Sequence, residues 1–413
     1  MTKVCIGLNN ISSVLPDMKS AFAKLGIKTI TVSNIKNQSV IVNNNVDFCI
    51  PTWKNRCPRF RPYRYYPSFK EWWDKKVELY IWNKVVKECD IFIFIVLSFK
   101  ENFADLEELS KKRKKIFFIF VGDDVRWYYA MKQEFAFYKL HPVEYGIEGI
   151  DSMESLKMRL SRIRIAEKYS TAIFSRLDQA QIQLRPYYRW NMMVVPNHYK
   201  VSREQRKLNP IVIHAPSNRK IKGTQFIIEA IDKLKNIDNI EVTLKLVENI
   251  PHKEALSMYE SADIVIDQLL LPGTGKLSTE SLAMGKIVLS NMSYEKYPQN
   301  NPKDCPVLDV NPDTIYEVLK KIILDYEFRC KHALLGRKYV ETYLDVAIFC
   351  KTILELSKGN PIAFDYIPGF LRDSYIPNSE EEKILMNEWT KYIKNEDWYN
   401  LYIKNGVRDN LIF

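Results

Sequence analysis

The chain has 413 residues, of which 46% are hydrophobic and 27% are charged, and its formal net charge is +11. These proportions are ordinary for a folded cytosolic protein, and at roughly 150 residues per domain the length indicates two or three domains. The positive charge favours acidic partners: phosphorylated ligands, nucleic acid or an anionic membrane surface.

Several classes of protein are excluded by simple features of the sequence. The seven cysteines show neither CxxC spacing nor a Cys/His cluster typical of zinc sites, so we expect reduced thiols. The N-terminus lacks the apolar stretch of a signal peptide. The longest apolar runs, residues 91–99 and 116–121, are far shorter than the roughly 20 residues of a spanning helix. We therefore expect a cytoplasmic protein that touches a membrane, if at all, peripherally on its inner face.

The N-terminal half opens with a β-α-β pattern. Residues 4–8 are apolar and predict a strand, residues 14–25 place apolar side chains at helical spacing, and residues 27–32 predict the next strand. Gly26 is the expected helix C-cap. This order is typical of the start of a doubly wound α/β sheet.

Residues 51–76 interleave lysines and arginines with aromatic side chains, and Pro51, Pro58, Pro62 and Pro67 are expected to break regular structure there. Such a mixture suits peripheral contact with an anionic membrane, where aromatic rings lie at the depth of the headgroups. Stacking on single-stranded nucleic acid and a long loop packed on its own domain are the alternatives. We expect no nucleic-acid partner.

A second candidate region follows the apolar runs 91–99 and 116–121, which are typical of central strands in a parallel sheet. The second run leads directly into a loop that holds Asp123, Asp124 and Arg126. Ligands of open α/β sheets bind at the carboxyl ends of strands, so these three are the candidate catalytic residues, able to bind hydroxyl groups or supply a base. An Asp124–Arg126 ion pair beside a helix N-cap is the alternative. The loop has no DxD spacing and does not indicate a metal.

Residues 153–172 predict a basic amphipathic helix, and residues 200–209 are charged and nearly free of apolar side chains, which is typical of a linker. Beyond them, residues 211–213 predict a buried strand. A polar turn, the cations Arg219, Lys220 and Lys222, and Gly223 follow, and a helical stripe then runs to residue 234. A helix N-terminus beside Arg219 and Lys222 would make a diphosphate site. An ordinary βα unit with a solvated basic loop is the alternative.

A second glycine-containing loop follows the strand predicted for residues 262–267. Pro272-Gly273-Thr274-Gly275-Lys276 is not a P-loop, because the required glycine and hydroxyl positions are Leu270 and Leu277. It leads into a helix with Glu280 one turn inside. Backbone N–H groups of the loop could meet a phosphate, and Glu280 could accept both hydroxyls of a ribose; a plain turn with a surface glutamate is the alternative.

Together, HAPSNRKIKGT (214–224) and ADIVIDQLLLPGTGKLSTESLAMGK (262–286) resemble the nucleotide-sugar domain of GT-B fold glycosyltransferases, most closely bacterial members of glycosyltransferase family 4. VGDDVRW (121–127) is similar to the GSDIR loop of many such members. The resemblance covers most of residues 2–359 and implies two Rossmann-like domains facing across a cleft. The implied division is an acceptor domain (1–199), a linker (200–209), a nucleotide-sugar donor domain (210–359) and a C-terminal helical extension (360–413).

The resemblance also implies the chemistry. Arg219, Lys222 and Gly223 would hold the diphosphate of a UDP- or GDP-type sugar, and Glu280 would grip the ribose. The second loop would add backbone N–H groups from Gly273, Thr274, Gly275, Ser278 and Thr279. No further cofactor and no metal is implied. The sugar, of hexose type, would pass to a glycan, lipid-linked or protein-linked acceptor with retention of anomeric configuration, as in the synthesis of bacterial surface polysaccharide.

Two positions depart from the family pattern. The first of two glutamates eight positions apart falls on Pro272, while Glu280 matches the second, and a histidine common before the GSD-type loop is replaced by Val121. The residues that usually face the reacting sugar carbon are thus absent, and we expect Asp123, Asp124 or Arg126 to take their place. An epimerase or phosphorylase on the same scaffold, and a catalytically degenerate binding subunit, are alternatives. Residues 379–403 predict a helix that returns to the N-terminal domain or forms an extra interface.

Overall fold

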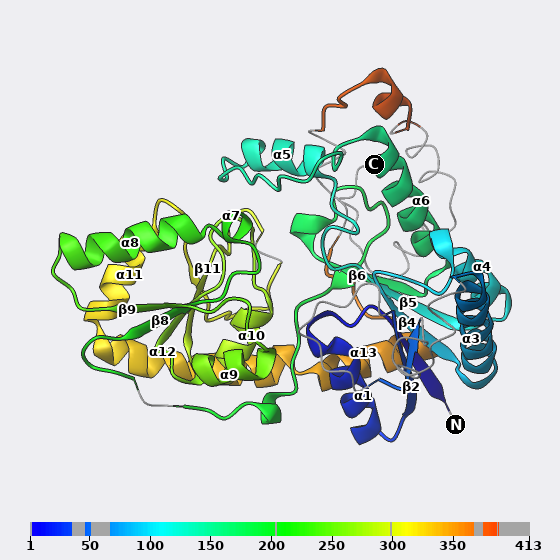
Figure 1. Ribbon diagram of the computed structural model, residues 1–413, viewed down its shortest axis with the longest axis horizontal. Helices are drawn as coiled ribbons and strands as arrows, with labels where there is room; N and C mark the ends of the chain where they lie inside the picture. The colour runs from blue at the N-terminus through cyan, green and yellow to red at the C-terminus, as the bar shows by residue number, and fades with distance from the viewer. Residues whose placement is uncertain are drawn as a thin grey trace.

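The computed structural model describes residues 2–34, 46–50, 67–202, 205–297, 300–366, 375–385 and 387. Figure 1 shows two lobes side by side, each built on one sheet with helices on both faces. Apolar runs alternate with helical stripes along the chain, and parallel strands require such crossover helices. The prediction of an α/β protein with two doubly wound, Rossmann-like domains is confirmed.

The N-terminal sheet is parallel throughout its described strands. Their order is β3 (Phe48–Ile50), β2 (Lys28–Asn34), β1 (Lys3–Leu8), β4 (Ile91–Ile95), β5 (Lys115–Ile119), β6 (Ala172–Ser175) and β7 (Tyr188–Arg189). Both predicted central strands, β4 and β5, lie in the middle of the sheet, where continuous apolar runs are buried on both faces.

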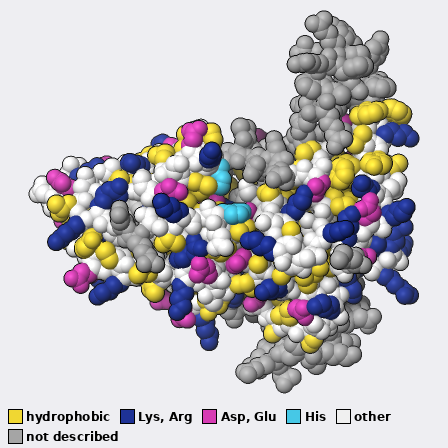
Figure 2. Space-filling model, turned by 90° about the horizontal axis from the view of Figure 1, so that it is seen from below, with side chains coloured by type: hydrophobic (Ala, Val, Ile, Leu, Met, Phe, Trp, Pro, Cys, Tyr) yellow, Lys and Arg dark blue, Asp and Glu magenta, His cyan; other side chains and the backbone are white. Residues whose placement is uncertain are grey.

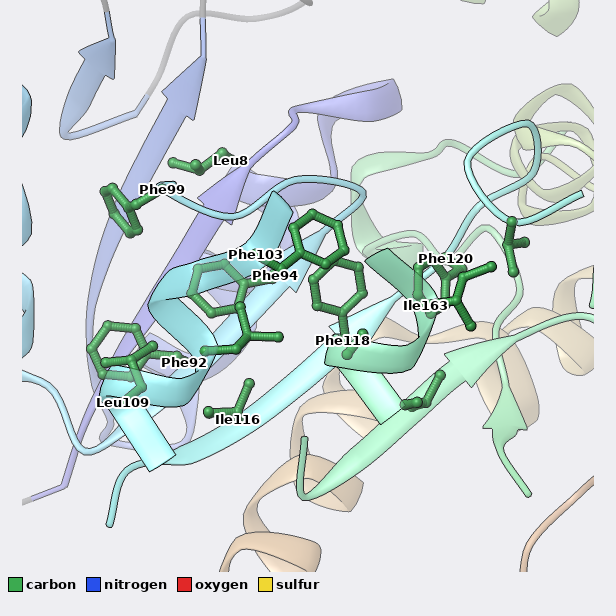
Figure 3. Packing of buried hydrophobic residues seen from close by; sticks show 14 of the residues in the cluster. Leu8, Phe92, Phe94, Phe99, Phe103, Leu109, Ile116, Phe118, Phe120 and Ile163 are labelled. Atoms are coloured by element: carbon green, nitrogen blue, oxygen red, sulfur yellow. The ribbon is translucent and has the colours of Figure 1, made fainter. Parts of the chain in front are cut away.

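Alternate side chains of these strands fill two cores. Phe92, Phe94 and Phe118 point to one face, where α3 (Pro67–Glu88), α4 (Ala104–Lys111) and α6 (Met153–Tyr169) cover them. Figure 3 shows this layer, with Phe118 close to Phe103 and Phe120. Ile93 and Phe117 point to the opposite face, against α1 (Val14–Lys24) and α13 (Val346–Lys358). The period of two in a strand sends successive side chains to opposite faces.

The structure corrects the prediction that prolines break regular structure throughout residues 51–76. α3 begins at Pro67 and continues past residue 76. Proline is tolerated at the start of a helix, because the N–H that it lacks has no intrahelical partner there. Residues 51–66 lie outside the described residues, so the described part of this segment is the first half of α3.

The C-terminal sheet has the described strand order β12 (Leu308–Asp309), β11 (Ile287–Ser290), β10 (Ile264–Ile266), β8 (Ile211–His214) and β9 (Thr243–Leu246), again parallel. One face is covered by α8 (Thr224–Asn236) and α11 (Ile315–Leu324), and the other by α9 (His252–Glu260), α10 (Lys276–Ala283) and the end of α12 (Tyr326–Tyr339). The short helix α7 (Arg219–Lys222) precedes α8. Before β8, Arg206 ties residues 205–209 to this lobe by donating to Asp263.

Two chain segments pass between the lobes and pair with each other. The amide of Val194 donates to Leu344 (3.1 Å), and the amide of Val346 donates back to Val194 (3.0 Å). The second segment is η7 (Val340–Leu344), and it leads into α13. Although α13 falls within the range assigned from sequence to the donor domain, it packs on α1 in the core of the N-terminal lobe, because its apolar stripe completes that face.

The described part of the C-terminal tail touches the N-terminal lobe. Of residues 379–403, for which a helix was predicted, 379–385 and 387 are described. Just before them, the Ile376 amide and carbonyl exchange hydrogen bonds of 2.9 and 2.7 Å with Gln133 of α5 (Tyr128–Phe137). The indole of Trp127 donates to the buried Glu382 (3.1 Å). The tail therefore holds α5 in place through hydrogen bonds to Gln133 and to Trp127, which directly precedes the helix.

Charged side chains of both signs lie on the face of the molecule that Figure 2 presents. Figure 2 shows lysine and arginine side chains spread over both lobes of the face it presents. None of the helices within the described ranges combines the length and the apolar character needed to cross a bilayer.

Candidate active site

The loops at the carboxyl ends of both sheets meet where the lobes adjoin. The rings of Tyr138 and Tyr297, one from each lobe, lie 5.7 Å apart. The Lys276 ammonium, at the start of α10, lies 2.8 Å from the carbonyl oxygen of Met193 and 3.4 Å from the carboxylate of Asp17, both in the N-terminal lobe. This is the edge at which doubly wound sheets bind ligands.

Asp267, directly after β10, organises the C-terminal side of this region. Its buried carboxylate accepts hydrogen bonds from the Gly275 amide (2.6 Å), the Ser278 hydroxyl (2.6 Å) and the Lys222 ammonium (2.7 Å). Burial alone raises the pKa of Asp267, but the Lys222 charge and the hydrogen bonds outweigh it, so the pKa is lowered. One ionised carboxylate thus joins the first predicted loop to the second.

The structure separates the two cations that the sequence placed together. Lys222 lies inside the loop cluster, with its ammonium 2.5 Å from the amide oxygen of Gln268 as well. Arg219 turns to the end of β9, where its guanidinium makes a two-point pair with Glu248 at 2.9 and 2.5 Å and is more than half exposed. Lys220 is exposed. Gly223 has φ +75° and packs its backbone against Leu269, which leaves little room for a side chain.

Three of the expected backbone donors are already engaged, since the amide of Thr279 donates to the carbonyl of Gly275 at 3.4 Å. The amide of Gly273 donates to the carbonyl of Asn291 (2.6 Å), and the amide of Gly275 is taken by Asp267. Thr274 contributes a carbonyl that accepts a hydrogen bond, and Thr279 is buried inside α10. The donors offered to a ligand are therefore the N–H groups of the first turn of α10, which a helix leaves without internal partners.

Glu280 lies one turn into α10 and is buried. The same carboxylate oxygen accepts from the Tyr199 hydroxyl (3.1 Å) and from His252 Nε2 (2.9 Å). The hydrogen bond to Glu280 raises the pKa of His252 above its ordinary value. A ligand hydroxyl would meet this carboxylate beside two side chains that already orient it.

The loop after β5 is held both by hydrogen bonds within the loop and by contacts with neighbouring elements, such as Arg159 with the carbonyl of Asp123. Asp124 accepts from the amides of Val121 (3.1 Å) and Gly122 (2.8 Å), and burial raises the pKa of Asp124 to about 6. The predicted alternative ion pair is corrected: Arg126 pairs with Asp123 (2.8 Å), not with Asp124. Asp123 is the exposed member of the three. The carboxylate of Asp124 accepts hydrogen bonds from two amides of its own loop, and it therefore stabilises the turn of that loop.

Several residues of the site were missed from the sequence. They are Asp267, Tyr199, His252 and the cross-lobe group Arg176, Asp178 and Asn300. Asp267 could have been identified from the sequence, because an aspartate directly after a buried strand lies at the edge of the sheet where ligands bind. The others depend on contacts between distant parts of the chain. Within the described ranges, no group of three or more His, Cys, Asp or Glu side chains could hold a metal ion.

Comparison with known proteins identifies the fold of this chain. No protein-family model and no curated protein sequence matches the chain. Sucrose-phosphate synthase from Thermosynechococcus elongatus superposes with a TM-score of 0.54 at 12% identity, covering 87% of this chain and 99% of that one. Anabaena HepE, solved in complex with UDP-glucose, gives 0.50 at 10% identity, covering 87% and 100%. The chain therefore has the GT-B architecture, two Rossmann-like domains that face each other across a cleft.

Proposed function

We propose that this protein is a glycosyltransferase of the family 4 type. It would move a hexose-type sugar from a UDP- or GDP-sugar to a glycan, lipid-linked or protein-linked acceptor in polysaccharide biosynthesis. The observation that carries the proposal is the cluster of Lys222, Asp267 and Gly275 at the start of α10, with Glu280 one turn further along. The HepE complex shows that a protein of this fold binds UDP-glucose.

The chemistry of the cluster suits departure of a nucleoside diphosphate. Negative charge develops on the leaving group, and fixed donors that face it stabilise the transition state. Lys222 supplies a cation held in place by Asp267, and the first turn of α10 supplies N–H groups. Glu280, already oriented by His252, would accept the ribose hydroxyls. Because fixed donors can stabilise this charge, we propose a reaction that needs no divalent cation. The resemblance to family 4 leads us to propose retention of the anomeric configuration.

On the acceptor side, Asp123 is the strongest of the candidate catalytic residues. It is exposed and its carboxylate is fixed by Arg126 and by the Tyr128 hydroxyl (2.9 Å). Asp124 is committed to its own loop, and Arg126 orients Asp123. We propose that Asp123 contacts the acceptor or the transferred sugar.

The donor site is tested by thermal stabilisation with UDP, GDP and their sugars. The wild type should be stabilised by at least one of them, because a ligand that binds only the native state raises Tm. Lys222→Met should abolish the shift, and Lys220→Met, which removes an exposed neighbouring charge, should leave it intact. Equal shifts in both variants would contradict the assignment of Lys222.

A catalytically degenerate binding subunit is the second candidate. It is favoured by Pro272 at the place of the first family glutamate and by the engagement of Asp124 with its own backbone. Sugar transfer, or hydrolysis of the donor, by the purified wild type that disappears in Lys222→Met would reject this candidate.

We also propose that the protein touches an anionic membrane peripherally through residues 51–76. In the described part of this segment, Trp72 is 51% and Trp73 39% exposed. The Lys76 ammonium lies 5.9 Å from the centre of the Trp72 ring. Exposed tryptophan beside lysine suits the headgroup region of an anionic bilayer.

A further inference from the structure

Arg176, in the N-terminal lobe, contacts the glycine loop of the C-terminal lobe. It directly follows β6, and its side chain is buried. One guanidinium nitrogen donates to the carbonyl of Pro272 and the other to the carbonyl of Thr274, both at 3.2 Å. Nε donates to Asp178 at 3.0 Å, so the buried charge is paired.

Gly273 lies between these two carbonyls and has no room for a side chain. Its φ is +95°, and a Cβ built there would lie 1.4 Å from Nη2 of Arg176. The guanidinium therefore occupies the space beside the Gly273 α-carbon. The glycine is required both by its left-handed backbone and by close approach of the other lobe.

Further hydrogen bonds support the contact between Arg176 and the glycine loop. Asn300, in the C-terminal lobe, donates to Asp178 (3.0 Å) and accepts from the amide of Leu177 (3.2 Å). The carbonyl of Gly273 accepts from Ser290 (2.7 Å) and Gln268 (3.1 Å). Three consecutive loop carbonyls are thus held by donors, and a single residue of the opposite lobe holds two of them.

From this geometry we infer that Arg176 is a positioning residue for the ligand site, acting through the loop that leads into α10. It orients Pro272 and Thr274, and thereby the first turn of α10, only while the lobes are in contact. The inference rests on the proposed function in one respect, namely that the ligand of this turn is a nucleoside diphosphate. Because the contact exists only across the lobes, ligand binding and lobe closure must favour each other by the same free energy.

The test compares Arg176→Met with wild type in hydrogen exchange of residues 273–279 and in calorimetric affinity for UDP and GDP. We expect faster exchange in this loop and at least about a tenfold loss of affinity, the size of an ordinary coupling between sites. X-ray scattering should show that the nucleotide compacts the wild type more than the variant. His141→Ala is the control, because it removes another cross-lobe contact, to Asp313 at 2.9 Å, without touching the loop.

Two further variants keep the test decisive if Arg176→Met does not fold. Arg176→Lys retains the charge for Asp178 but cannot bridge two carbonyls, so it should show an intermediate loss. Gly273→Ala disturbs the same contact from the loop side. Gly359→Ala is its matched control, because Gly359 also has a positive φ, +84°, but faces open space.

Unchanged loop exchange and nucleotide affinity in Arg176→Met and Gly273→Ala would overturn the inference. Loss of exchange protection together with lost affinity would support it. If loop protection falls in Arg176→Met while the wild type binds no nucleoside diphosphate, the anchoring role stands and the proposed donor site is overturned.

Discussion

A buried carboxyl group in α5 should make the protein less stable as the pH rises. Glu134 is 4% exposed, and burial raises its pKa from 4.5 to about 7. The unfolded chain releases this proton near pH 4.5, whereas the folded chain keeps it up to about pH 7. The folded state therefore binds more protons in between, and the free energy of unfolding falls across that window. The shift corresponds to about 3 kcal/mol at most.

Glu134→Gln keeps the size of the side chain and can keep its contact with Gln181, which donates to Glu134 at 2.9 Å, but it removes the titration. We expect the variant to match the wild type at about pH 4 and to exceed it by up to about 3 kcal/mol above pH 7. Thermal unfolding between about pH 4 and pH 8 measures the difference as a rise in Tm of several degrees. Glu144→Gln, which changes an exposed glutamate beyond the end of α5, is the control. Parallel pH profiles for wild type and Glu134→Gln would refute the reasoning.

Three other outcomes follow from the site and the surface. Asp267→Asn should lower the free energy of unfolding by about 3–5 kcal/mol, because it leaves Lys222 partly buried without its counter-charge. Chemical denaturation measures this free energy. A loss below about 1 kcal/mol would contradict the prediction. Glu280→Gln should weaken calorimetric binding of UDP but not of 2′,3′-dideoxy-UDP, and equal losses for both nucleotides would argue against the ribose contact. Trp72→Ala combined with Trp73→Ala should reduce cosedimentation with vesicles containing phosphatidylserine, whereas Leu208→Ala, which removes an apolar side chain that is 80% exposed, should not.

The fold was accessible from the sequence because its strands carry a strong local signal. Continuous apolar runs such as Ile91–Ile95 are typical of strands that are buried on both faces of a parallel sheet. Helical spacing of apolar residues, as in α13, does not say which lobe the helix covers. Only the packing of Phe349 and Ile353 on the face of α1 decides that.

The candidate site was predictable to the extent that its residues lie in the loops and helix starts that follow buried strands. Lys222, Gly275 and Glu280 follow two strands whose ends must lie at one edge. The partner of Arg219 was not predictable, because Glu248 is brought to it by a third strand, β9. Arg176 was missed for the same reason: its partner Pro272 is 96 residues away and in the other lobe. Secondary-structure propensity and the spacing of residue types along the chain do not predict contacts between residues so far apart in sequence.

The paired crossing segments limit how the protein can be divided and how it can move. Val194 and Leu344 are hydrogen-bonded neighbours in two separate passages of the chain, so the lobes are joined by a two-stranded hinge and not by one tether. The two lobes can rotate relative to each other about this pair of segments, but they cannot reorient independently. A cut between residues 205 and 209 leaves the lobes attached through the second passage. A fragment that ends before α13 exposes the apolar face of α1, so we expect residues 1–199 alone to aggregate until a second fragment supplies that helix.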